Sequence, residues 1–292
     1  MHAHKIIPST KSNLDYSTQK CQPNSTQLNK TMMDAKSLLC DALAAAGTAL
    51  CVAPAIAILD QAIVENAAGS KTLTRSLKDS VTQLARKPLQ FAKSPAFLLL
   101  WGVYGGTYLA VNVATTACDR THATAEQRHA VKFVGVSSVN VALNVSKDRI
   151  FAKLFGAGVP RPVPIRTIAA FAARDSMTVF ASFNVAPVVA EALAGAEIAG
   201  ARTVAQLVCP VVMQWFSAPL HLIGLNWYNV STATNSERVS FLQQEYFKTA
   251  LARSCRILPA FGIAPLINTP LRATTHEWFC NHDHAILQAC QQ

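Results

Sequence analysis

The hydrophobic residues of this chain fall into long blocks that are separated by shorter polar stretches. The blocks run for about 18 to 28 residues, which is the length that an α-helix needs to cross the hydrocarbon core of a bilayer. The pattern predicts an all-α fold, an integral membrane six-helix bundle. The expected spans are Leu38–Glu65, Pro95–Cys118, Val131–Phe151, Ile165–Ala190, Val204–Tyr228 and Phe247–Phe279.

The expected spans come in pairs along the chain. Each pair has a first span, a basic loop and a second span, and in the first loop Ser76–Ala85 reads as a short amphipathic helix. A long-period repeat of this kind predicts three helix pairs around a central cavity. The predicted parts are a disordered polar tail over 1–36, a membrane domain over 37–280 with repeats at 38–118, 130–190 and 203–280, and a polar tail over 281–292.

Composition supports the membrane interpretation. The chain is 51% hydrophobic and only 14% charged, whereas soluble domains carry roughly 25% charged residues. The net charge is +10, but among the loops between spans most Lys and Arg lie after the first, third and fifth spans, as the positive-inside rule predicts. We therefore expect the lipid bilayer as a partner and no nucleic acid, while a soluble all-helical protein is the least favoured alternative.

Motifs for catalysis and metal binding are missing from the sequence. There is no dinucleotide-binding or phosphate-binding glycine motif, no HExxH and no GxSxG. The eight cysteines include no CxxC pair, and the one metal-like group, Cys280, His282, His284 and Cys290, lies in the polar C-terminal tail. The chain is therefore expected to be no enzyme, to hold no cofactor and to bind no metal.

Arg174 and Asp175 are the sharpest chemical feature, because they interrupt an apolar span. A charge at the centre of the membrane costs roughly 2.5–3.5 kcal/mol on insertion scales, so such residues normally face an aqueous cavity or a charged partner. Arginine suits the binding of carboxylates and phosphates. The pair is therefore either a solute contact or part of a structural network between helices.

Several amides and one histidine also lie within the apolar spans. They could line a pore, or they could tie helices together, each contributing about 0.6 kcal/mol. His221 follows Pro219 closely and could serve a proton-coupled step, since histidine titrates in the useful range. The amides are Asn112, Asn140, Asn144, Asn184, Gln214 and Asn268.

The layout and two local motifs resemble the mitochondrial carrier superfamily. The fourth span begins its motif with Arg174-Asp175 and continues to Phe183, and the sixth contains Pro259 and Pro270, which is similar to the pattern of that family's even-numbered helices. Pro54 and Pro219 match its odd-helix kink prolines. The resemblance implies a three-repeat solute carrier of the mitochondrial inner membrane, for a carboxylate or amino-acid-like metabolite.

Two residue sets follow from the resemblance together with the polar residues of the spans. The predicted substrate-binding residues are Arg174, Asp175, Thr107, Asn268, Asn112, Gln214 and Arg272. The predicted gate residues are Arg149, His221, Pro54 and Pro219. The sequence departs from the family at the charged gate positions, because Ile56, Ser146 and His221 stand at the acidic positions and Leu59, Arg149 and Gly224 at the basic ones.

These departures motivate a second hypothesis. A carrier-like protein without the charged gate could act in organelle organisation or as a subunit of a complex instead of moving a solute. The tail over 1–36 would then offer a contact for a protein partner.

Overall fold

The computed structural model describes residues 25–157 and 159–289, and the side chains of 35–157 and 159–279. These residues form helices and connecting loops, with no strand among them. The chain divides into two units, Met1–Ala35 and Lys36–Gln292. The packed core, the cavity and the buried charges all lie in the second unit.

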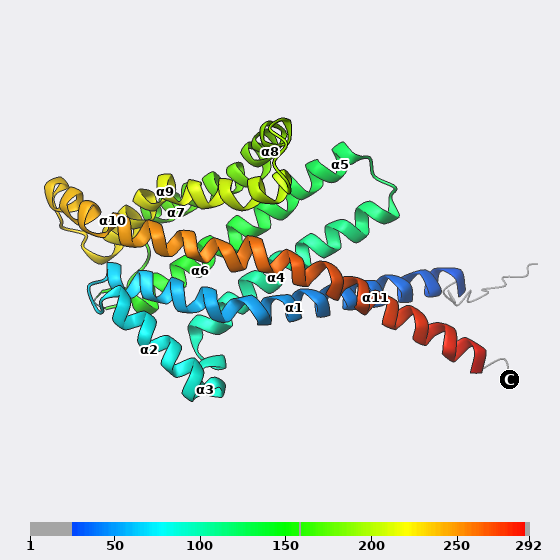
Figure 1. Cartoon of the computed structure of the whole chain (residues 1–292). Coiled ribbons are helices and arrows are strands. Elements are labelled where there is room, and N and C mark those ends of the chain that lie inside the picture. The colour runs from blue at the N-terminus through cyan, green and yellow to red at the C-terminus, as the bar shows by residue number, and fades with distance from the viewer. Residues whose placement is uncertain (1–24, 158, 290–292) are drawn as a thin grey trace, which may run out of the picture. The chain divides into compact units, whose positions relative to one another are not determined.

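Helices follow one another along the chain with short connections (Figure 1). Three π-helical segments, η1 to η3, interrupt longer helical stretches and join α5 to α6, α7 to α8 and α10 to α11. The elements are α1 (Ser25–Ala67), α2 (Leu73–Arg86), α3 (Pro88–Ala92), α4 (Pro95–Arg120), α5 (Ala125–Ala130), η1 (Val131–Val136), α6 (Ser137–Phe155), α7 (Ile165–Phe180), η2 (Ala181–Val185), α8 (Ala186–Gly195), α9 (Ala201–Asn229), α10 (Asn235–Ile257), η3 (Leu258–Ile263) and α11 (Ala264–Ala289).

Five helical stretches are long and apolar enough to cross a membrane, so the chain is an all-α, multi-pass membrane protein. They are Ala35–Ala67, Pro95–Arg120, Ile165–Gly195, Ala201–Asn229 and Asn235–Phe279. The expected span Val131–Phe151 is helical but is not among the five, because Lys147, Asp148 and Arg149 lower its hydropathy. The arrangement of six spans in three repeats therefore stays a prediction.

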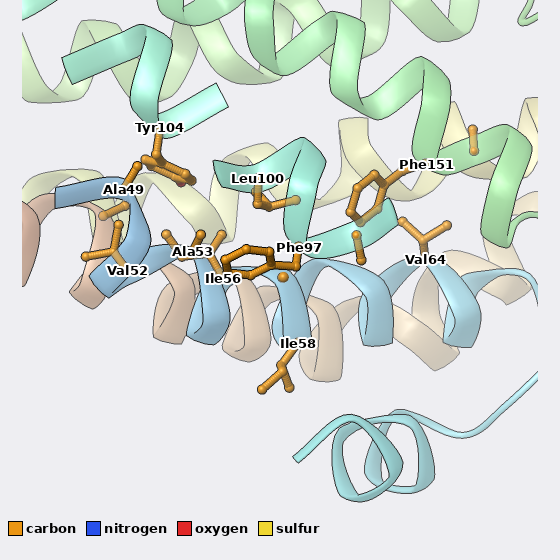
Figure 2. Packing of buried hydrophobic residues seen from close by; sticks show 14 of the residues in the cluster. Ala49, Val52, Ala53, Ile56, Ile58, Val64, Phe97, Leu100, Tyr104 and Phe151 are labelled. Carbon is orange, nitrogen blue, oxygen red and sulfur yellow. The ribbon is translucent and has the colours of Figure 1, made fainter. Parts of the chain in front are cut away.

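The main hydrophobic core forms where α1 packs against α4. Val52, Ala53 and Ile56 of α1 face Phe97 and Leu100 of α4, as Figure 2 shows, and all five side chains are buried. Many core residues of α1 are alanines, and small residues let membrane helices approach closely. α1 thus packs against α4, which lines the cavity described below.

A second packing surface joins α7 to α9, which also packs against α8 and α10. Gly224 of α9 lies so close to Phe171 of α7 that a Cβ atom at this glycine would come within 2.8 Å of the Phe171 ring. The Thr167 hydroxyl donates to the Gly224 carbonyl at 3.1 Å. The side chains of α7 therefore pack directly against the backbone of α9 at Gly224.

Burial in the spans is reversed relative to a soluble protein. Many large apolar side chains on the spans are exposed, whereas several charged and amide side chains are buried between helices. Side chains of this kind can face lipid, and buried charges in such a setting face one another or an aqueous cavity. The exposed residues include Leu43, Leu50, Phe180, Phe216 and Leu266.

Candidate functional site

Six charged side chains form a buried cluster that joins four helices. We call it the Asp60 cluster: Asp60, Lys147, Asp148, Arg174, Asp175 and Arg256. Lys147 Nζ lies 2.6 Å from both Asp60 and Asp148, and Arg256 lies 3.0 Å from Asp60. Three carboxylates meet three cations, so the cluster is balanced in charge and ties α1, α6, α7 and α10 together.

Arg174 is the centre of the cluster on α7 and is fully buried. Its guanidinium donates to Asp175 at 2.7 Å and also pairs with Asp148. It contacts His221 Nδ1 of α9 at 2.7 Å. Because a guanidinium only donates hydrogen bonds, Nδ1 of His221 is the acceptor.

A second group of polar side chains surrounds Asp41, which precedes Asp60 by 19 residues on α1. We call it the Asp41 cluster: Asp41, Thr116, Arg272 and His276. Asp41 accepts hydrogen bonds from Thr116 at 2.6 Å and Arg272 at 2.8 Å, and His276 lies 2.9 Å away. This cluster joins α1, α4 and α11.

Two amides extend the second cluster toward the middle of the helices. Asn268 Nδ2 donates to Asn112 at 2.7 Å, and Thr48 donates to Asn268 at 3.3 Å. Asn112 also donates to the Asp41 carbonyl at 3.1 Å. These bonds connect the same three helices, α1, α4 and α11.

A cavity of about 310 Å³ lies between the two clusters. It extends from Arg256, which touches Asp60, to Asn268, which touches Thr48. Its size is near the lower end of the roughly 300–1,000 Å³ range of small-molecule sites. The polar and charged lining residues are Tyr104, Thr107, Tyr108, Ser137, Asn140, Asn144, Asp175, Thr178, Ser182, Gln214, Arg253, Arg256, Asn268 and Thr269.

Each of the three π-helical segments contributes to the cavity wall. Val136 comes from η1, Ser182 from η2 and Ala260 from η3. A π-helical segment leaves backbone groups without their usual partners and often marks a functional site. The Ala260 carbonyl accepts a hydrogen bond from Tyr108 of α4 at 3.0 Å.

Arg253 differs from the other charged residues of the wall. Its side chain is buried, with 3% exposure, and its Nη2 donates to Gln214 at 2.8 Å. Nε is buried without a hydrogen-bond partner in both Arg253 and Arg256, but Arg253 alone of the two has no described carboxylate within salt-bridge distance. The wall therefore holds one cation in excess of the balanced Asp60 cluster.

Four of the seven predicted substrate-binding residues line the cavity: Thr107, Asp175, Gln214 and Asn268. Arg174 lies behind Asp175 in the Asp60 cluster. Asn112 and Arg272 both donate hydrogen bonds to Asp41, at its carbonyl and its carboxylate respectively. Their part in binding a solute stays a prediction.

The predicted gate residues are spread over the unit. His221 touches Arg174, whereas Arg149 is exposed and lies outside the described ion pairs of the Asp60 cluster. Pro54 and Pro219 are half-buried inside α1 and α9, which continue through them. The buried charges of α6 are instead the preceding residues, Lys147 and Asp148.

Arg253 and Arg256 are not among the predicted site residues, although both lie within the expected sixth span. The signal was present, because a charge inside a span is a functional-site hypothesis by default, as for Arg174. Residues three apart on a helix share a face. That spacing places both guanidinium groups on the cavity side of α10.

No group of three or more metal-ligating side chains occurs within the part of the chain that the structure describes. The side chains of the metal-like group over 280–290 lie outside the described residues, as does most of the predicted N-terminal tail.

Comparison with known proteins identifies a family. The family model described as "Probable citrulline exporter" matches residues 44–276. No curated protein and no solved structure gives a match. The matched family is one of exporters, which confirms the prediction that the chain is a transporter-type membrane protein and not an enzyme.

The match corrects the resemblance to mitochondrial carriers, which rested on short motifs. At two of the presumed gate positions the structure leaves no room for a charge: Ile56 is fully buried in the α1–α4 core, and Gly224 lies against Phe171. The Arg174-Asp175 motif forms part of a buried ion-pair cluster that includes residues outside the carrier signature. By a family match that spans most of its length, the chain belongs to the family of probable citrulline exporters.

Proposed function

We propose that this protein carries citrulline, or a closely related neutral amino acid, across a membrane. The observation that carries the proposal is the cavity of about 310 Å³ among the spanning helices, with buried charges of both signs on its wall. An amino acid carries a carboxylate and an ammonium group, so it needs partners of both signs. The family description supports the choice of citrulline.

Asp175 is the partner that we propose for the ammonium group. Both of its oxygens accept bonds from Arg174, yet the residue lines the cavity. A carboxylate offers about four lone-pair sites, so it can accept a further donor. Arg174 then acts as a positioning residue that holds Asp175 toward the cavity.

The uncharged end of the solute would meet hydroxyl and amide groups. Thr107 donates to Asn140 at 3.2 Å, and Asn144 donates to the same amide at 2.9 Å. Asn268 and Gln214 also reach the wall. Groups of this kind match the donors and acceptors of a ureido group without requiring a charge.

The proposal is tested by efflux of labelled citrulline from liposomes that contain the purified protein. Wild-type protein should release citrulline faster than empty liposomes, and Asp175→Asn should slow release by at least about tenfold, the effect of losing roughly 1.4 kcal/mol of binding. Asp79→Asn, an exposed carboxylate on α2, is the matched control and should leave the rate unchanged.

Absence of release by the wild-type protein, in liposomes where its correct folding is verified, would reject the proposed function. Release of citrulline by Asp175→Asn at the wild-type rate would reject the proposed role of Asp175 and leave the proposed function standing.

The membrane itself is a separate proposal. The sequence predicts the mitochondrial inner membrane as the location. It also predicts that the spans form three helix pairs, and both statements stay proposals. Fractionation of cells with markers for each membrane tests the location, and recovery in any other membrane would reject it.

A further inference from the structure

We infer that Arg253 is the carboxylate anchor of the cavity, and that its positive charge makes the protein select amino acids with neutral side chains over those with cationic side chains. This inference rests on the proposed function and assigns the chemistry of the same cavity. It is carried by the one buried cation of the wall that has no carboxylate partner among the described residues.

The comparison with Arg256 isolates what is unusual about Arg253. Both guanidinium groups are buried on the cavity side of α10. Arg256 lies 3.0 Å from Asp60, whereas Arg253 has only the amide oxygen of Gln214 as a partner, at 2.8 Å. A buried charge without a partner is strongly destabilising, so an anion from outside the chain is the natural complement.

The geometry of the guanidinium also favours a carboxylate. The bond from Nη2 to Gln214 orients the group and is its only hydrogen bond among the described residues. A guanidinium binds carboxylates through two parallel N–H donors. Gln214 in turn donates to Thr178 at 3.1 Å and to the Pro210 carbonyl at 2.9 Å, so the supporting amide is itself held in place.

The charge balance of the wall determines which side chains the solute can carry. The Asp60 cluster contains three acids and three bases, and Arg253 adds one positive charge. Asp175 is the one acid among the described lining residues, and the ammonium group of the solute is its proposed partner. No described acid of the wall then remains for a cationic side chain. Ornithine and arginine would bring a second positive charge into a cavity that already has an excess of positive charge, whereas the ureido group of citrulline would not.

The experiment measures citrulline transport in proteoliposomes, with competition by unlabelled compounds. For the wild-type protein, the decarboxylated analogue of citrulline, which keeps the amine and the ureido group, should compete at least about 30-fold more weakly than citrulline, the effect of removing one partner of a buried charge pair. Ornithine should also compete weakly. Equal competition by the decarboxylated analogue would overturn the inference without any variant.

Variants then assign the effect to Arg253. Arg253→Gln should raise the KM for citrulline by at least about 30-fold and should remove the discrimination against the decarboxylated analogue. Arg253→Lys keeps the charge and should restore part of the discrimination. Arg166→Gln, an exposed arginine at the start of α7, is the matched control and should leave the KM unchanged.

The outcomes separate the inference from the proposed function. Citrulline transport with an unchanged KM in Arg253→Gln would overturn the role of Arg253 and leave the proposed function standing. If Arg253→Gln does not fold in detergent, Arg253→Lys tests the inference in its place. Equal competition by citrulline and its decarboxylated analogue in a folded Arg253→Lys protein would overturn the inference. Failure of the wild-type protein to transport citrulline would reject the proposed function itself.

Discussion

At the scale of single residues, Arg174 shows how a charge is held within a membrane helix. Its side chain is fully buried, and its guanidinium meets Asp148, Asp175 and His221. The three partners lie on three different helices, α6, α7 and α9. The residue therefore stabilises the junction of three helices and orients Asp175 on the cavity wall.

Replacing Arg174 should destabilise the protein more than removing a balanced pair. Arg174→Met leaves the acids of the cluster in excess, and breaking a buried ion pair typically costs about 3–5 kcal/mol. The double variant Arg174→Met with Asp175→Leu restores the balance of charge and should recover part of this loss. Thermal unfolding in mild detergent measures both, and a single variant that melts with the wild type would contradict the structural role of Arg174.

The same residue shows what the sequence could predict about the site. A charged pair inside an apolar block was sufficient to predict that Arg174 and Asp175 have buried partners or face a cavity. The identity of the partners was not predictable, because Asp60, Lys147 and Asp148 lie far away along the chain and meet Arg174 only through helix packing. Arg253 could have been predicted in the same way as Arg174, because it is also a charged residue within an expected span.

At the scale of elements, hydrophobic blocks predicted where the long helices run, and local signals could have refined their ends. The structure starts α10 at Asn235, ahead of the expected Phe247, because Thr234 and Glu237 form a capping box. The three π-helical segments were not predictable from periodicity. Their lining of the cavity wall emerges only when the helices are packed together.

The contact between α7 and α9 gives a prediction at this scale. Gly224→Ala should destabilise the protein by about 1–3 kcal/mol, because its Cβ would meet the Phe171 ring at 2.8 Å and overpacking has costs of this size. Gly102→Ala on α4 is the matched control, since a Cβ there meets nothing within 4 Å. It should be neutral or stabilising by about 0.5–1 kcal/mol.

Thermal unfolding of the two glycine variants in the same detergent distinguishes the effects. An equal shift in both melting temperatures would show that the close approach of α7 and α9 does not control stability.

At the scale of the described unit from residue 36 onward, two polar clusters are built on α1 at separate levels, one around Asp41 and one around Asp60. Asp41 and Asp60 are 19 residues apart, which corresponds to about 28 Å along a helix and is close to the roughly 30 Å thickness of the bilayer core. The cavity is lined by Asp175 and Arg256 of the Asp60 cluster and by Asn268, which is linked through Asn112 to the Asp41 carbonyl. A solute in the cavity would therefore sit between two hydrogen-bonded layers, each joining at least three helices.

The central claim is that the cavity is the path of the solute, and two neighbouring serines test it most directly. Ser137 lines the cavity, whereas its neighbour Ser138 is exposed and is not among the lining residues. The measurement is efflux of labelled citrulline from proteoliposomes that contain Ser137→Phe or Ser138→Phe. We predict that Ser137→Phe, whose ring fills the cavity, loses at least about 90% of the wild-type rate, the effect of a barrier higher by roughly 1.4 kcal/mol, while Ser138→Phe retains it. A folded Ser137→Phe protein that exports citrulline at the wild-type rate would contradict the claim.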